Sequence, residues 1–196
     1  LDCGAKKVVF ASSAHVYGIS PKYLPTDESH PLWLQNNYTL TKILGEQLCQ
    51  LYYDNHGLSY TALRLYNSYG PRQANGYFIP DMVSKAIGGS IVLPGGNTTK
   101  DWVYVEETAR AFLLALDTPF IGDINIGSGI ETDLATIAKH IAQAMGASFS
   151  TTSNANATRM QADNSRARRV LGWTPTVSIM EGLERIFQHE GIKVKV

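Results

Sequence analysis

The sequence predicts an α/β protein in which short buried strands alternate with amphipathic helices. Two continuous apolar runs, at residues 6–11 and 60–66, are typical of strands that are covered on both faces of a parallel sheet. Between them, residues 38–55 form one predicted helix, which Gly57 ends. Four of its leucines recur at helical spacing and form one apolar stripe: Leu40, Leu44, Leu48 and Leu51. A strand, a helix and a second strand in this order favour a parallel sheet.

The second half of the chain is predicted to be more irregular, because glycine and proline become frequent after residue 70. Short strands are predicted at residues 91–93, 102–105 and 123–126. Helices are predicted at residues 80–87, 106–116, 133–145, 164–171 and 179–189. Thr132 is expected to cap the helix that begins at Asp133. Residues 148–158, which are small and polar, are expected to form a loop.

Composition excludes several classes of protein. The 196 residues suit one domain, or one domain with part of another, and 44% of them are hydrophobic, as in globular proteins. Lys and Arg number 17, as do Asp and Glu, so the sequence lacks the basic excess of nucleic-acid-binding or anionic-membrane-binding proteins. No apolar run is long enough to span a membrane, and no secretory signal pattern is present. We therefore expect no membrane and no nucleic-acid partner.

Two cysteines, Cys3 and Cys49, are too few for a disulfide framework and too isolated for a zinc site. A reducing, cytoplasmic setting is therefore expected, with no metal centre.

Hydroxyl, phenol and ammonium groups within the first 42 residues indicate proton transfer chemistry. Ser12 and Ser13 follow the first strand, and Tyr38 and Lys42 lie four residues apart at a helix start, on one face. A phenol has an ordinary pKa of about 10, and a cation within about 4–6 Å lowers such a value by roughly 1–3 units. The phenolate can then accept a proton from a sugar or alcohol hydroxyl. The pair alone also occurs by chance on exposed helices, so its meaning depends on the motifs around it.

Those motifs occur in a fixed order along nearly the whole chain. They are VFASSAHVYG at 9–18, Tyr38-(x)3-Lys42-(x)3-Glu46, LRLYNSYGP at 63–71, KDWVYV at 100–105, NIGSG at 125–129, ADNSRA at 162–167 and LGW at 171–173. As a set they resemble the extended short-chain dehydrogenase/reductases, and more narrowly the nucleotide-sugar epimerases of the UDP-glucose 4-epimerase type.

The resemblance implies the C-terminal part of a Rossmann-like parallel sheet together with a small mixed α/β substrate-binding domain. Residues 1–70 would be a remnant of the NAD-binding domain that carries the catalytic residues. Residues 71–196 would be mainly the substrate-binding domain, with some segments returning to the first. Family members open with a strand, a glycine-rich loop and a helix that bind the NAD pyrophosphate, and nothing like it occurs here. Because the chain also begins at Leu1, we expect a truncated chain that does not bind NAD tightly on its own.

Specific roles follow from the same resemblance. Tyr38 would be the catalytic base, Ser13 would share the substrate hydroxyl with it, and Lys42 would hold the nicotinamide ribose and tune Tyr38. Ser12 and Leu65 would complete the cofactor-binding set. The substrate-binding set would be Ser13, Tyr66, Asn67, Val92, Lys100 and Met160.

Three of these assignments are more specific. Asn67 would bind the diphosphate, and Val92 would pack near the nucleobase. Lys100 stands where relatives usually have an arginine for the diphosphate, and a lysine keeps the charge but not the two-pronged hydrogen bonding. The arginine that relatives carry shortly before Asp163 is absent, and Arg159 is the candidate to replace it.

The resemblance also ranks the reactions. Sugar dehydratases usually follow the catalytic Ser or Thr with an Asp-Glu pair, whereas this chain has Ala14 and His15. We therefore expect NAD-dependent epimerisation at C4 of a UDP-glucose/UDP-galactose type of sugar. The side chain of His15 is expected to point away from the site.

Two alternatives stay open. The chain could be a non-catalytic relic or fragment that binds a nucleotide or oligomerises without redox activity. It could also belong to a reductase or decarboxylase that shares Ser13, Tyr38 and Lys42. In each case a homo-oligomer is expected, formed through helix 38–55 or through the exposed edge of the sheet.

Overall fold

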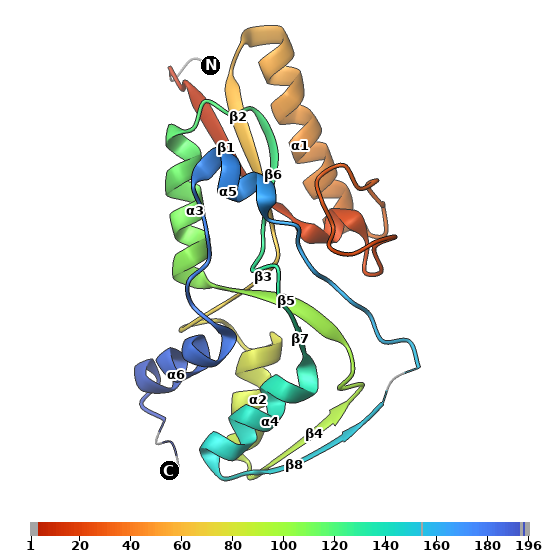
Figure 1. Cartoon of the computed structure of the whole chain (residues 1–196), viewed down its shortest axis with the longest axis vertical. Coiled ribbons are helices and arrows are strands. Elements are labelled where there is room, and N and C mark those ends of the chain that lie inside the picture. Colours follow the sequence, from red (N-terminus) through yellow and green to blue (C-terminus); the bar gives the residue numbers. More distant parts are fainter. Residues whose placement is uncertain (1–3, 154, 193, 195–196) are drawn as a thin grey trace.

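A parallel sheet forms the upper half of the molecule in the computed structural model, which describes residues 4–153, 155–192 and 194 (Figure 1). Its strands are β1 (Lys7–Ser13), β2 (Ser59–Leu65) and β6 (Gly122–Ile126), in the order β1-β2-β6. Helix α1 (Asn37–His56) covers one face, and α3 (Val105–Asp117) and α5 (Ser165–Leu171) lie on the other. The expected α/β class with a parallel sheet is confirmed, whereas Cys3 lies outside the described residues.

The lower half contains two smaller sheets. Strand β3 (Asn67–Tyr69) runs parallel to β5 (Thr99–Tyr104), which pairs antiparallel with β7 (Glu131–Asp133). Strand β4 (Ser90–Pro94) runs parallel to β8 (Ser148–Thr152). Helices α2 (Phe78–Ile87) and α4 (Leu134–Met145) pack against that pair, and α6 (Ile179–His189) lies beside α4 (Figure 1). The division into domains at residue 70 stays a prediction.

Each half has its own hydrophobic core. The upper core gathers Leu63, Ile124 and Trp173, which are fully buried between the sheet, α3 and α5. The lower core includes Ile141 and Phe187 from α4 and α6. Burial of one such side chain contributes about 1.5–3 kcal/mol, so truncation of any of them would destabilise its half.

Helix α1 begins and ends at residues that favour those positions. The Asn36 side chain accepts a hydrogen bond from the backbone N–H of Thr39, and the Thr39 side chain accepts one from Asn36 in return. Gly57, with φ of +67°, ends the helix in the left-handed region. The leucine stripe faces away from the sheet, since its four members are 38% to 55% exposed.

Two sequence predictions in the lower half are wrong. Asp133, not Thr132, caps α4, because its carboxylate accepts a hydrogen bond from the backbone N–H of Thr136 at 2.7 Å. Thr132 lies in strand β7, where it pairs with Lys100 of β5. Residues 148–152 form strand β8 instead of a loop. The polar composition of these residues does not indicate a strand. The strand forms because its backbone pairs with β4, which lies far away in the sequence.

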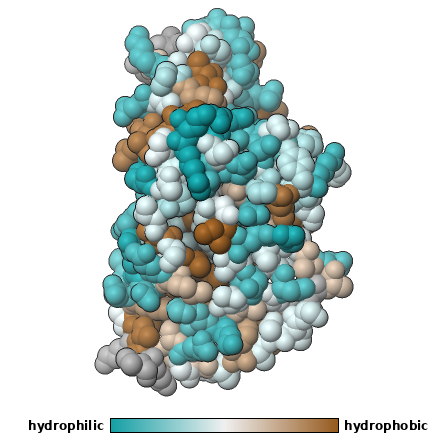
Figure 2. Space-filling view, in the orientation of Figure 1, coloured by the Kyte–Doolittle hydropathy of each residue, from teal (hydrophilic) through white to brown (hydrophobic). Residues whose placement is uncertain are grey.

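Surface hydrophobicity is dispersed on the face in view. Figure 2 shows hydrophobic side chains there in small separate patches among hydrophilic ones. Within the described residues, no helix combines the length and apolar character that a membrane span requires.

Candidate active site

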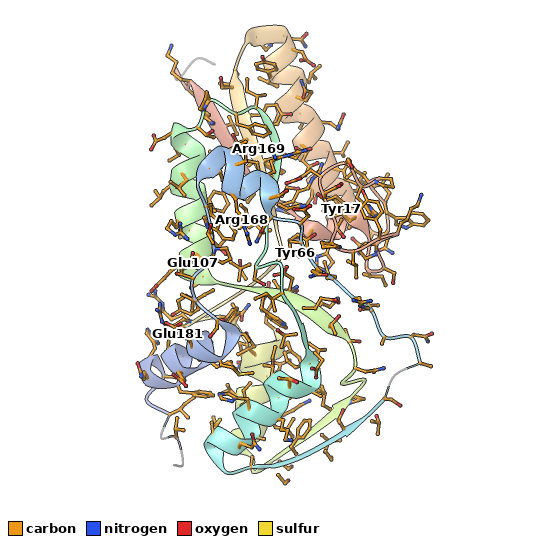
Figure 3. The ribbon with its side chains drawn as sticks, in the orientation of Figure 1. Tyr17, Tyr66, Glu107, Arg168, Arg169 and Glu181 are labelled. Carbon is orange, nitrogen blue, oxygen red and sulfur yellow. The ribbon has the colours of Figure 1, made fainter. Side chains whose placement is uncertain are left out.

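A cavity of about 500 Å³ lies at the carboxyl ends of β1 and β2. Such strand ends are where parallel α/β sheets form their binding sites. The predicted site residues that line it are Ser12, Ser13, Tyr38, Lys42, Leu65, Tyr66, Asn67 and Met160. In Figure 3, Tyr66 lies where the upper sheet meets the lower half, so the cavity opens between the two.

Strand register explains why these residues meet. Ser12 pairs with Arg64 and Ser13 with Leu65, so β1 and β2 end side by side. Helix α1 starts at Asn37 and packs on both strands, which brings its first turns to the same edge.

Tyr38 and Lys42 lie together over the end of β1. The Lys42 ammonium is 5.5 Å from the centroid of the Tyr38 ring and 5.6 Å from that of Phe10. It donates a hydrogen bond to the backbone carbonyl of Ala11 at 2.9 Å. This bond anchors the ammonium beside the phenol, and the half-exposed Tyr38 ring stays accessible from the cavity.

The two serines at the end of β1 have different partners. Ser12 is buried and donates its hydroxyl proton to Glu46 of α1. Ser13 instead accepts from the backbone N–H of His15 at 3.2 Å. The Ser12 proton is therefore committed to a carboxylate, whereas both contacts of Ser13 are to His15.

The expectation that His15 points away from the site is wrong. His15 lines the cavity from the short helix η1 (Ala14–Tyr17), with its Nδ1 3.2 Å from Oγ of Ser13. Its ring stands edge-on to Tyr38, with centroids 6.2 Å apart. Burial, and to a smaller extent the charge of Lys100, lower the pKa of His15 below its ordinary value of 6.5, so the ring is neutral at pH 7.

A buried carboxylate next to the cavity joins distant parts of the chain. Asp101 of β5 accepts from the backbone N–H groups of Ser128, Gly129 and Ala162 at 2.6, 2.9 and 3.0 Å. Its backbone carbonyl accepts from the side chain of Asn67 at 2.9 Å. Burial raises the pKa of Asp101 to about 6 in spite of these donors.

Two predicted substrate-binding residues do not line the cavity. Val92 is exposed on β4, because Ile91 and Leu93 alternate with it and take the buried face. Lys100 donates to Oγ1 of Thr158 at 3.3 Å, and burial lowers its pKa. Arg159, the candidate replacement arginine, pairs with Glu131.

Several lining residues escaped sequence analysis. Beside His15, they are Ala11, Ser68, Gln73, Tyr77, Phe78 and Trp102. Asp101 and Trp102 follow Lys100 in the motif at 100–105, which could have indicated them. Among the described residues, no group of three His, Cys, Asp or Glu side chains could hold a metal ion.

The described residues fit one end of an NAD molecule. Ser12, Tyr38, Lys42 and Leu65, the residues that the resemblance assigns to NAD, all line the same cavity. The sequence of the described residues contains no strand that is followed by the glycine-rich turn and helix of a pyrophosphate site. The part of the chain that the structure describes thus offers contacts for the nicotinamide end and not for the pyrophosphate end.

The sequence of the chain is similar to those of curated UDP-glucose 4-epimerases. The chain is 37% identical to a putative UDP-glucose 4-epimerase of Methanocaldococcus jannaschii, over 92% of this chain and 61% of that protein. It is 32% identical to the UDP-glucose 4-epimerase of Mycolicibacterium smegmatis, over 93% and 61% respectively. The chain thus spans about three fifths of the length of these curated relatives.

Solved structures show the same fold. The UDP-glucose 4-epimerase of Thermotoga maritima with UDP-glucose superimposes with a TM-score of 0.87 at 28% identity, covering 97% of this chain and 65% of that one. The family model described as "NAD dependent epimerase/dehydratase family" matches residues 1–127. Since that match covers more than half of the residues, the chain belongs to the NAD-dependent epimerase/dehydratase family.

Proposed function

We propose that this protein epimerises a nucleotide sugar at C4, of the UDP-glucose/UDP-galactose type, by transient oxidation. The observation that supports this most is that Ser13, Tyr38 and Lys42 line one cavity at the end of a parallel sheet. The relatives named as UDP-glucose 4-epimerases support the substrate class.

Each residue has a distinct task in this proposal. The Tyr38 oxygen takes the proton of the C4 hydroxyl, while Ser13 binds the same oxygen. Lys42 holds the ribose of the nicotinamide and keeps a positive charge beside Tyr38. NAD, which Ser12, Tyr38, Lys42 and Leu65 would hold, would supply a reversible hydride acceptor for C4, and Tyr38 would give the proton back when the hydride returns. The keto sugar must turn between these steps, within a cavity of about 500 Å³.

The diphosphate would bind on the side of Asn67 and Lys100. Asn67 lines the cavity, and its side chain donates a hydrogen bond to the backbone carbonyl of Asp101. Lys100, the residue before Asp101, supplies a partly buried positive charge. Met160, which is buried in the same wall, would limit the size of the sugar substituent.

Dehydration is less well supported. Elimination of water requires an additional carboxylic acid and base beside the catalytic serine, and positions 14 and 15 hold Ala and His. The non-catalytic alternative has one observation in its favour, which is that the sequence contains no glycine-rich phosphate-binding loop.

The test is interconversion of UDP-glucose and UDP-galactose by this chain in the presence of NAD, followed by proton NMR of the anomeric signals. Epimerisation that is lost in Tyr38→Phe supports the proposal. Binding of UDP-glucose by calorimetry without any turnover supports the non-catalytic alternative instead. Absence of both binding and turnover contradicts the proposal for this chain.

A further inference from the structure

His15 touches two residues to which the proposed function gives roles in proton handling. Its Nδ1 lies 3.2 Å from the Ser13 hydroxyl, and its ring stands nearly perpendicular to the Tyr38 ring, with centroids 6.2 Å apart. The charged groups near it are cationic, with Lys100 acting on it from β5 and Lys42 lining the same cavity from α1. These cations disfavour a further positive charge on the ring, so the neutral imidazole is the form to consider.

The hydrogen-bonding capacity of Ser13 is nearly filled by His15 alone. A hydroxyl group offers one proton and two acceptor positions. The backbone N–H of His15 takes one acceptor position at 3.2 Å. One proton and one acceptor position are left, and the His15 ring and the substrate oxygen must divide them.

The tautomer of His15 decides this division. If Nδ1 carries the ring proton, it donates to Ser13, whose own proton is then free for the substrate. If Nε2 carries the ring proton, Nδ1 accepts the Ser13 proton, and Ser13 can only accept from the substrate.

The proposed reaction, on which this inference rests, requires the first arrangement. The C4 oxygen gives its proton to Tyr38 and becomes a carbonyl oxygen, which can accept hydrogen bonds but cannot donate them. A Ser13 that only accepts would lose its bond to the oxygen at that moment. A Ser13 that donates keeps the bond in both states and favours the charge that develops on the oxygen.

We propose that His15 is a positioning residue whose Nδ1–H donates to Ser13 Oγ and thereby directs the Ser13 proton onto the substrate oxygen. The imidazole takes no proton from the substrate in this role. It makes Ser13 the donor in the hydrogen bond to the substrate oxygen, which Tyr38 alone does not do.

The first test is the tautomer of His15 in the unliganded chain, measured from the ring nitrogen shifts in a long-range proton–nitrogen NMR spectrum. His15→Asn identifies the signals among the five histidines. We expect a protonated Nδ1 in the wild type and a shift toward the Nε2–H form in Ser13→Ala, which removes the acceptor. An Nε2–H ring in the wild type, or a ring indifferent to Ser13→Ala, overturns the proposal.

The second test is a double-mutant cycle on the affinity for UDP-glucose, measured by calorimetry. Without His15 the Ser13 hydroxyl is free to turn away from the substrate, so we expect His15→Ala to weaken binding by up to about 3- to 10-fold, the effect of losing one neutral hydrogen bond. His15→Asn should restore most of the affinity, because its amide N–H₂ reaches the position of Nδ1. In the Ser13→Ala background, His15→Ala should have no further effect, because the residue acts through Ser13.

The control is His56→Ala on the exposed end of α1, which should bind as the wild type does. Additive effects of His15→Ala and Ser13→Ala overturn the proposal, since a packing role would persist without the hydroxyl. If the wild type binds no nucleotide sugar, the proposed function fails for this chain, and the tautomer still decides the inference about His15.

Discussion

Arg64 on β2 and Glu46 on α1 form a two-pronged ion pair inside the molecule. Nε and Nη2 of Arg64 donate to the two carboxylate oxygens of Glu46 at 2.9 and 2.7 Å, and both side chains are only 3% exposed. Ser12 donates to the same carboxylate. The pair therefore fixes the rotation of α1 against the sheet, and with it the direction in which Tyr38 and Lys42 project.

Glu46→Gln is expected to lower the free energy of unfolding by about 3 kcal/mol, because it leaves a buried guanidinium without its main counter-charge. Asp123, which also binds Arg64, compensates only in part. Urea unfolding followed by circular dichroism measures the change. The control is Glu181→Gln, which breaks the exposed pair with Arg185 and should cost less than about 1 kcal/mol. Equal effects of the two substitutions would show that the buried pair does not hold α1.

Tyr38→Phe is expected to lower kcat for sugar epimerisation by at least about 100-fold, because no other phenol of the cavity takes the substrate proton in the proposed mechanism. The unfolding free energy should change little, since the ring is half exposed. Tyr52→Phe, on an exposed part of the same helix, is the matched control and should keep its activity. Full activity in Tyr38→Phe would assign the base to another residue.

The sequence predicted the central part of this site because the signals are local. Ser13 ends an apolar strand, and Tyr38 and Lys42 begin a periodic helix. Because parallel strands end at one edge of a sheet, these three residues are expected to lie together, and no contact between distant residues is needed to predict it. The predicted parallel sheet is confirmed for the same reason.

The features that sequence analysis missed depend on contacts between distant residues. The His15 side chain points into the cavity because η1 turns over its N-cap residue Ser13. The spacing of residues in the sequence does not predict that turn. The Asp101 cluster joins residues 101, 128, 129 and 162, which are separate in the sequence. Val92 was assigned from resemblance alone, and the alternation of buried residues in β4 turns it outward.

The Asp101 cluster makes stability depend on pH in a defined direction. The folded-state pKa is raised from 3.8 to about 6, so the contribution of Asp101 is fully present below pH 4 and is lost as the pH rises through 6. Two units correspond to about 3 kcal/mol. The difference in unfolding free energy between wild type and Asp101→Asn should therefore fall by up to about 3 kcal/mol between pH 4 and pH 7.

That difference is measured by urea unfolding of both proteins at matched pH values, since other titrating groups cancel in the subtraction. A difference that grows with pH would mean that the four hydrogen bonds from Ser128, Gly129 and Ala162 outweigh burial. In that case the native Asp101 would be stabilised as a carboxylate, and the pKa would lie below its ordinary value.

The leucine stripe of α1 is expected to form the interface of a homo-oligomer. Leu44 and Leu48 are 52% and 55% exposed on this long helix, whose buried residues Thr39 and Glu46 face the other way. A charge placed in such a contact loses its hydration without gaining a partner. Size-exclusion chromatography with light scattering should therefore show a dimer for the wild type and a monomer for Leu44→Glu with Leu48→Glu.

Leu113→Glu is the matched control, since Leu113 is 65% exposed on α3, away from the stripe, and should leave the dimer intact. A dimer that survives the double substitution would move the interface to β1, which lies at the end of the strand order β1-β2-β6 and leaves backbone groups free to pair with another strand. A monomeric wild type would contradict both interfaces, because neither the stripe nor the strand edge would then have a partner.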